Sequence, residues 1–133
     1  MRDFETLALP AEPVATAPDG TLARVLLALS GGSLAHFELP VGATSHAVQH
    51  RTVEEIWYFL GGRGEIWRAN AAGQSVVAVE PGLSVTIPLG TAFQFRAIGP
   101  EPLTFLAITI PPWPGDGEAF AVEGRWAADL PAA

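Results

Sequence analysis

Turn residues recur at short, regular intervals along this chain of 133 residues, and this spacing limits the folds that the chain can adopt. Glycine, proline and asparagine separate short runs that are rich in β-branched and aromatic residues. We expect strands at 22–29, 33–39, 55–60, 64–69, 75–79, 83–87, 93–97 and 103–110. No segment with a helical period is long enough to compete with them. Many short strands at such spacing predict an all-β sandwich or barrel.

Polarity alternates within the expected strands. Phe93, Phe95 and Ala97 share one face of a strand, because successive side chains of a strand point to opposite sides. The same alternation puts Glu54, Ile56 and Tyr58 together on one face of the strand at 55–60, and Glu55 on the other. Both faces of that strand carry large apolar groups, so we expect both to be covered. Glu55 is interpreted as a solvated or interface carboxylate.

Length and hydropathy favour a single domain. About half of the residues are apolar, enough for one packed core over residues 1–133. Residues 1–20 are expected to form an N-terminal arm, and residues 111–133 a C-terminal extension. The sequence lacks the run of about 18 apolar residues that would span a membrane. Residues 1–5 are acidic and do not resemble a secretory signal, so the expected location is the cytoplasm.

Two missing residue types exclude several chemistries. The chain has no cysteine, which rules out disulfides, thiolate metal sites and a cysteine nucleophile. It also has no lysine, so a side-chain Schiff base cannot form. The formal charge of −7 disfavours nucleic acid and anionic lipid as partners.

Two spaced patterns occupy the middle of the chain. From Gly42 to Gly61 the sequence reads G-x5-V-x-H-x3-E-x6-G, and from Gly82 to Ala97 it reads G-x5-P-x-G-x2-F-x3-A. These patterns resemble the two conserved motifs of the cupin superfamily, G-x5-H-x-H-x3-4-E-x6-G and G-x5-P-x-G-x2-H-x3-N. The resemblance implies a small single-domain cupin, an antiparallel jelly-roll β-barrel with a lumen at one end. It also implies a homodimer.

The resemblance bears on metal binding as well. Most cupins hold a divalent metal with three histidines and one glutamate. His50 and Glu54 fall on two of these positions, while Val48 and Phe93 occupy the other two and cannot coordinate. A rearranged site would need His50 and Glu54 together with His46 or His36. The favoured interpretation is a degenerate metal site, in which His50 and Glu54 form a polar pair and no cofactor is bound.

Three functions follow from these residues. The favoured hypothesis is binding of a small-molecule ligand in a mainly apolar lumen, where His50, Glu54 and Tyr58 supply the polar groups. The lumen would be lined by Val48, Phe93, Phe95 and Phe105, although these phenylalanines could equally fill the barrel as core. The second hypothesis is a metal-independent isomerase, epimerase or lyase with His50 and Glu54 as acid and base. The third is a metal-dependent oxygenase with a rearranged site.

Overall fold

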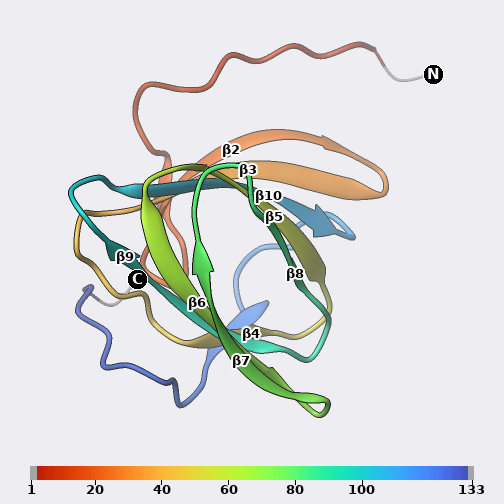
Figure 1. The fold of residues 1–133 in the computed structure, drawn as a ribbon. Coiled ribbons are helices and arrows are strands. Elements are labelled where there is room, and N and C mark those ends of the chain that lie inside the picture. The colour runs from red at the N-terminus through yellow and green to blue at the C-terminus, as the bar shows by residue number, and fades with distance from the viewer. Residues whose placement is uncertain (1–2, 132–133) are drawn as a thin grey trace.

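The computed structural model describes residues 3–131, which form eleven β-strands (Figure 1). In chain order they are β1 (Ala15–Thr16), β2 (Leu22–Leu29), β3 (Gly32–Leu39), β4 (Val48–His50), β5 (Glu54–Gly61), β6 (Arg63–Asn70), β7 (Gly73–Val79), β8 (Ser84–Ile87), β9 (Ala92–Ile98), β10 (Leu103–Ile110) and β11 (Ala119–Ala121). The described residues contain no helix that is long and apolar enough to cross a membrane.

The strands form two antiparallel sheets that face each other. The six-stranded sheet has the order β1-β2-β3-β10-β5-β8, and the five-stranded sheet has the order β11-β4-β9-β6-β7. The last long strand, β10, therefore lies between β3 and β5, and the chain crosses between the sheets several times (Figure 1). This arrangement confirms the expected all-β jelly roll.

An aromatic cluster fills part of the space between the sheets. Trp57 on β5 stacks on Phe105 of β10, with ring centroids 4.2 Å apart. The rings of Phe93 and Phe95, both on β9, meet Trp57 edge-on at 5.3 and 5.2 Å. Such offset and edge-to-face contacts are favourable beyond the apolar area they bury. Phe95 is fully buried in this core, whereas Phe93 and Phe105 also form the wall of a cavity.

The eight predicted strands are all present. The strands at 22–29 and 103–110 have the predicted bounds, and the other six differ by one or two residues at either end. The short strands β1, β4 and β11 were not predicted, because two or three residues are too few to show an alternating pattern.

Part of each terminal segment contacts the barrel, while residues 3–9 are exposed. In the N-terminal arm, Pro10 and Ala11 accept hydrogen bonds from Arg24 of β2 through their carbonyl oxygens, at 2.8 and 3.0 Å. In the C-terminal extension, β11 pairs with β4 and so widens the five-stranded sheet. The backbone of Trp126 is bound by the side chain of Gln94 on β9.

Candidate ligand-binding site

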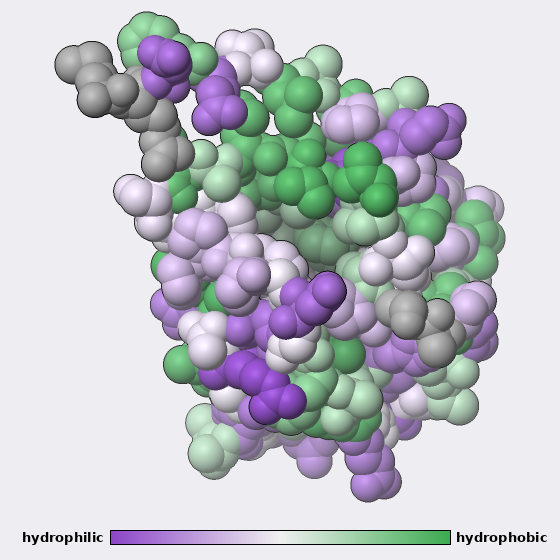
Figure 2. All heavy atoms as spheres, turned by 180° about the vertical axis from the view of Figure 1, so that it is seen from behind, coloured by the Kyte–Doolittle hydropathy of each residue, from purple (hydrophilic) through white to green (hydrophobic). Residues whose placement is uncertain are grey.

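A pocket of about 420 Å³ lies between the two sheets. Its walls come from β1, β2, β3, β5 and β10 on one side, and from β4, β9 and the segment 112–119 on the other. Figure 2 shows a hollow in one face of the molecule, with hydrophobic surface within and above it. A cavity of this size and polarity is typical of small-molecule sites.

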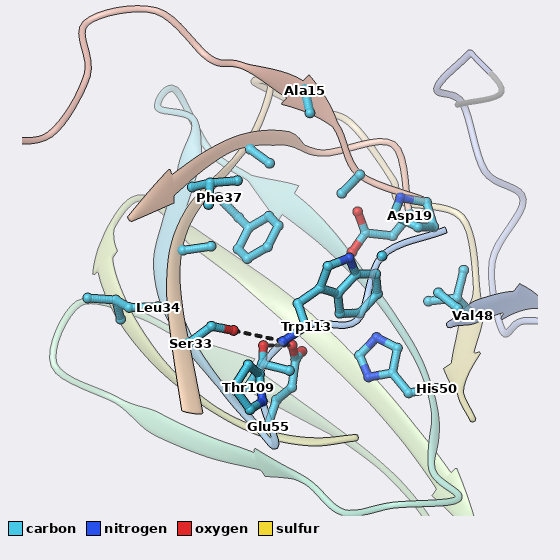
Figure 3. Close-up of a pocket in the computed structure, with 18 of the residues that line it drawn as sticks. Ala15, Asp19, Ser33, Leu34, Phe37, Val48, His50, Glu55, Thr109 and Trp113 are labelled. Carbon is cyan, nitrogen blue, oxygen red and sulfur yellow. Dashed lines mark hydrogen bonds between the residues drawn. The ribbon is translucent and has the colours of Figure 1, made fainter. Parts of the chain in front are cut away.

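Aromatic rings form much of the wall. They come from β3, β5, β9, β10 and the loop after β10, and they are Phe37, Trp57, Phe93, Phe105 and Trp113. Trp113 is held in place because its backbone N–H donates a hydrogen bond of 2.9 Å to the hydroxyl oxygen of Ser33 (Figure 3). The loop that carries Trp113 is rich in proline and cannot continue the strand ladder. It therefore leaves the sheet after β10 and lines the pocket as a separate segment.

His50 is the histidine of the pocket. It is 7% exposed, and its ring meets those of Phe93 and Trp113 edge-on at 5.2 and 5.3 Å. Its Nδ1 is buried and has no hydrogen-bond partner among residues 3–131. Burial lowers the pKa of His50, and the carboxyl groups of Asp19 and Glu118 only partly oppose this effect. The neutral imidazole is therefore the favoured form.

Glu55 is the second polar group. The side chain is 6% exposed and its two oxygens accept hydrogen bonds, one from Trp57 Nε1 at 3.0 Å and one from the hydroxyl of Thr109. Burial raises the pKa of Glu55, although these two hydrogen bonds work in the opposite direction. The carboxyl group thus sits in a site that disfavours its charge.

Asp19 is the third polar group, and it comes from the loop before β2. It is 8% exposed, and its Oδ1 accepts hydrogen bonds from the backbone N–H and the hydroxyl of Thr21, at 3.0 and 2.6 Å. Burial raises the pKa of Asp19, the hydrogen bonds from Thr21 oppose this, and the charge of Glu55 adds to the rise. In Figure 3 the side chains of Asp19, His50 and Glu55 point toward the part of the pocket that holds Trp113.

The structure corrects the predicted orientation of β5. Glu54 and Tyr58 were expected to face the lumen, but both are exposed on the outer face of the six-stranded sheet, Tyr58 by 48%. Glu55 faces the pocket instead, together with Trp57. The expected alternation along β5 is present, but the wrong set of residues was expected to face inward. The observed orientation buries Trp57 and Phe59, which removes more apolar area from water than burying Ile56 and Tyr58 would. The pairing of His50 with Glu54 is therefore wrong.

The other two histidines do not reach the pocket. His46 lies against the C-terminal segment, where its Nε2 is 2.9 Å from the carbonyl oxygen of Pro131. His36 lies between Ala35 and Phe37 on β3, and those two residues line the pocket, so His36 faces the opposite side of the strand. Neither histidine joins His50.

The comparison with protein families decides where this chain belongs. A family model for the cupin domain matches residues 35–109, more than half of the chain. The chain belongs to the cupin family. This cupin is 36% identical over 81 residues to an uncharacterized protein of Methanocaldococcus jannaschii, a match that covers 61% of this chain and 62% of the relative.

Solved structures show the same fold at low identity. A protein with a double-stranded β-helix domain from Klebsiella pneumoniae is 18% identical, with a TM-score of 0.63 over 93% of this cupin and 99% of that chain. Oxalate decarboxylase of Bacillus subtilis is 17% identical, with a TM-score of 0.68 over 84% of this cupin and 30% of that chain. The capsular polysaccharide assembling protein of Staphylococcus aureus is 14% identical, with a TM-score of 0.65 over 78% and 30%. This cupin therefore spans about a third of two of these chains.

The pocket does not fit the metal that the cupin fold implies. Within residues 3–131, no group of three or more His, Asp or Glu side chains is placed to hold a metal ion. Val48 and Phe93 are paired across β4 and β9, and both line the pocket at positions where histidines would converge. Their side chains fill that space with hydrocarbon.

Glu55, Asp19 and Trp113 line the pocket but were not predicted as site residues. The cupin motif allows three or four residues between its second histidine and its glutamate, and a spacing of four selects Glu55 instead of Glu54. That signal was present in the sequence. Asp19 and Trp113 carried none, because the folding of two separate loops brings them to the pocket.

Proposed function

We propose that this cupin binds a small, mostly apolar molecule between its two sheets. The observation that supports this most strongly is His50, a nearly buried imidazole whose buried Nδ1 lacks a hydrogen-bond partner in the described part of the chain. A buried polar group without a partner costs about 1–3 kcal/mol. A ligand that fills the apolar pocket and bonds to His50 recovers that cost.

The surrounding groups support a ligand with one polar end. The polar side chains of Asp19, His50 and Glu55 contribute to one pocket, whereas the remaining lining is chiefly aliphatic and aromatic. Ligand sites commonly combine such an apolar lining with a few polar groups that fix orientation. The apolar body would lie against Phe37 and Phe105, and the polar end would lie near His50.

A library of small molecules tests this function, with binding followed by ligand-observed NMR on the full chain. Ala35→Phe places a ring in the pocket, and Ala78→Phe adds the same ring at an exposed position on β7. We expect binders of the unmodified protein to lose about tenfold or more in affinity, roughly 1.4 kcal/mol, with Ala35→Phe only. A library without binders, or binding that Ala35→Phe leaves intact, contradicts the proposal.

Acid–base catalysis is a second candidate, supported by the opposite pKa shifts of His50 and Glu55 in one pocket. A neutral imidazole can take a proton, and a carboxyl group with a raised pKa can give one. An isomerase, epimerase or lyase needs both steps. Incubating identified binders in D₂O tests this candidate, because exchange of a carbon-bound proton should occur and should stop with His50→Asn. If no binder exchanges, this candidate fails and ligand binding remains.

Oxalate decarboxylation is not proposed for this chain. Oxalate is a dianion, and no arginine is among the described residues that line the pocket. The pocket therefore offers a dianion no opposing charge, and burial disfavours unpaired negative charge there. An oxygenase is not proposed either, because the residues present do not fit a metal.

We also propose that two copies of this cupin associate through the outer face of the six-stranded sheet. Ile56, Tyr58 and Leu60 of β5 are exposed there, and Ile108 of the adjacent strand β10 lies opposite Ile56. An apolar patch of this kind often marks a protein interface. The patch lies on the face of β5 that points away from the pocket.

A further inference from the structure

The charges around the pocket have one sign. Asp19, Glu55 and Asp116 are the charged side chains of its lining, apart from the titratable His50. The arginines that the structure describes are placed elsewhere, and the chain has no lysine. Arg24 and Arg51 are adjacent in sequence to lining residues, but both make contacts elsewhere. Arg24 donates to the carbonyl oxygens of Pro10 and Ala11, and Arg51 donates to the carbonyl oxygen of Gly117 and lies over the ring of Phe120. An anionic ligand would therefore find carboxyl groups and no opposing charge.

Asp19 and His50 present hydrogen-bond acceptor atoms to which a ligand could donate. Both hydrogen bonds from Thr21 reach Oδ1 of Asp19, and Oδ2 receives none from residues 3–131. A cation bound beside Asp19 would favour the ionised carboxylate and so counteract the effect of burial on its pKa. The ionised oxygen only accepts, so the ligand group on Oδ2 would carry N–H or O–H. His50 is favoured as a neutral ring and presents one acceptor nitrogen. A ligand group with several N–H donors would satisfy both side chains.

The aromatic walls favour a positive charge in the same place. Trp113 and Phe93 flank His50, and Trp57 lies behind Phe93 in the same cluster. The face of an aromatic ring attracts a cation, most strongly when water is excluded. Two buried carboxyl groups beside such rings would stabilise an organic cation bound among them. The net charge of −7 would also draw cations toward the molecule.

We infer that the ligand of this pocket is an organic ammonium ion, a protonated amine carrying an aromatic or branched aliphatic body. This inference rests on the proposed small-molecule binding and narrows it to one chemical class. The ammonium group donates to Asp19 and His50 and lies between the aromatic rings. The apolar body extends along Phe37 and Phe105 toward β2 and β3.

Matched compounds separate the charge of the ligand from its shape. The library contains triplets with the same apolar body and an ammonium, hydroxyl or carboxylate end, such as 2-phenylethylamine, 2-phenylethanol and 3-phenylpropionate. Titration calorimetry on the full chain should show the amine of a triplet binding about tenfold more tightly than the alcohol, and the carboxylate binding most weakly. Asp19→Asn should weaken binding of the amine much more than binding of the alcohol and so remove most of the preference for the amine. Glu101→Gln, which removes one exposed charge outside the pocket, is the matched control.

The outcomes distinguish this inference from the broader proposal. If alcohols or carboxylates bind as tightly as the matching amines, the ligand is not an organic cation and this inference fails. The broader proposal of small-molecule binding still holds in that case, provided that Ala35→Phe abolishes the binding. An amine preference that Asp19→Asn leaves intact also overturns this inference. If Asp19→Asn does not fold, Glu55→Gln provides the same comparison. A library in which no triplet member binds removes both proposals.

Discussion

At the scale of single residues, the site depends on a choice between two adjacent glutamates. A strand alternates with a period of two, so a shift of one residue exchanges the inner and outer faces. The sequence Glu54-Glu55 satisfies the cupin spacing in either phase. Packing decides between them, because the phase that buries Trp57 also turns Glu55 inward. There its two oxygens accept hydrogen bonds from the indole N–H of Trp57 and the hydroxyl of Thr109.

The burial of Glu55 predicts how stability depends on pH. Its pKa in the folded state is raised above the ordinary value of 4.5, so its favourable contribution is complete below that value and is lost as pH rises through the folded pKa. Glu55→Gln mimics the neutral form, so the unmodified protein should lose stability relative to this variant as pH rises from 4.5. Urea unfolding, followed by tryptophan fluorescence between pH 4.5 and 8, measures the difference. Glu54→Gln is the exposed control, and a Glu55→Gln difference that stays constant with pH would show that Glu55 is not desolvated.

The opposite orientations of Glu54 and Glu55 also predict the result of rebuilding a metal site. Val48→His with Phe93→His adds two imidazoles to His50 on the pocket wall, and Glu55 supplies the carboxylate. We expect the double variant to bind Co²⁺ or Zn²⁺, measured by Co²⁺ absorption and calorimetry. Adding Glu55→Gln should weaken that binding by about tenfold or more, whereas adding Glu54→Gln should not. Equal effects of the two glutamine substitutions would contradict the assigned phase of β5.

At the scale of elements, the sequence predicted what alternation and turn residues encode. The eight longer strands carry a clear period of two between glycine or proline turns, and all eight were found. Asp19 reaches the pocket from the turn between β1 and β2, and the pairing of β1 with β2 was not predicted. Trp113 depends in the same way on a loop held by Ser33, which is distant in sequence. Such long-range placements leave no periodic signal in a single chain.

The C-terminal extension carries a prediction at this scale. Gln94 is 1% exposed, and its amide nitrogen donates to the carbonyl oxygens of Ser45 and Trp126, both at 2.8 Å, while its oxygen accepts from Trp126 N at 2.9 Å. Gln94→Ala leaves these backbone groups without partners, which should lower the free energy of unfolding by about 2–3 kcal/mol. Gln49→Ala, on the neighbouring strand β4, removes a side chain without a hydrogen bond in the described residues and should change it by about 0.5 kcal/mol. Urea unfolding checks both, and equal losses would mean that the extension is held by other contacts.

At the scale of the whole molecule, the two faces of the six-stranded sheet have different surroundings. The inner face builds the aromatic core and the pocket, and the outer face leaves Ile56, Tyr58 and Ile108 in contact with solvent. Because β5 is apolar on both faces, the two proposals are compatible: a ligand would lie against the inner face and a second copy against the outer face. The pocket and the proposed interface should therefore respond to substitution independently.

That independence gives the last prediction. Sedimentation velocity of the full chain at micromolar concentration should show a dimer, and Tyr58→Arg should shift it to the monomer, because two copies would then bury like charges at their shared face. Val41→Arg adds the same charge at an exposed turn between β3 and β4 and should leave the dimer intact. The Tyr58→Arg monomer should keep its affinity for pocket ligands, since Tyr58 points away from them. A monomeric unmodified chain would refute the interface, and a monomer that loses ligand binding would show that the pocket is completed by the second copy.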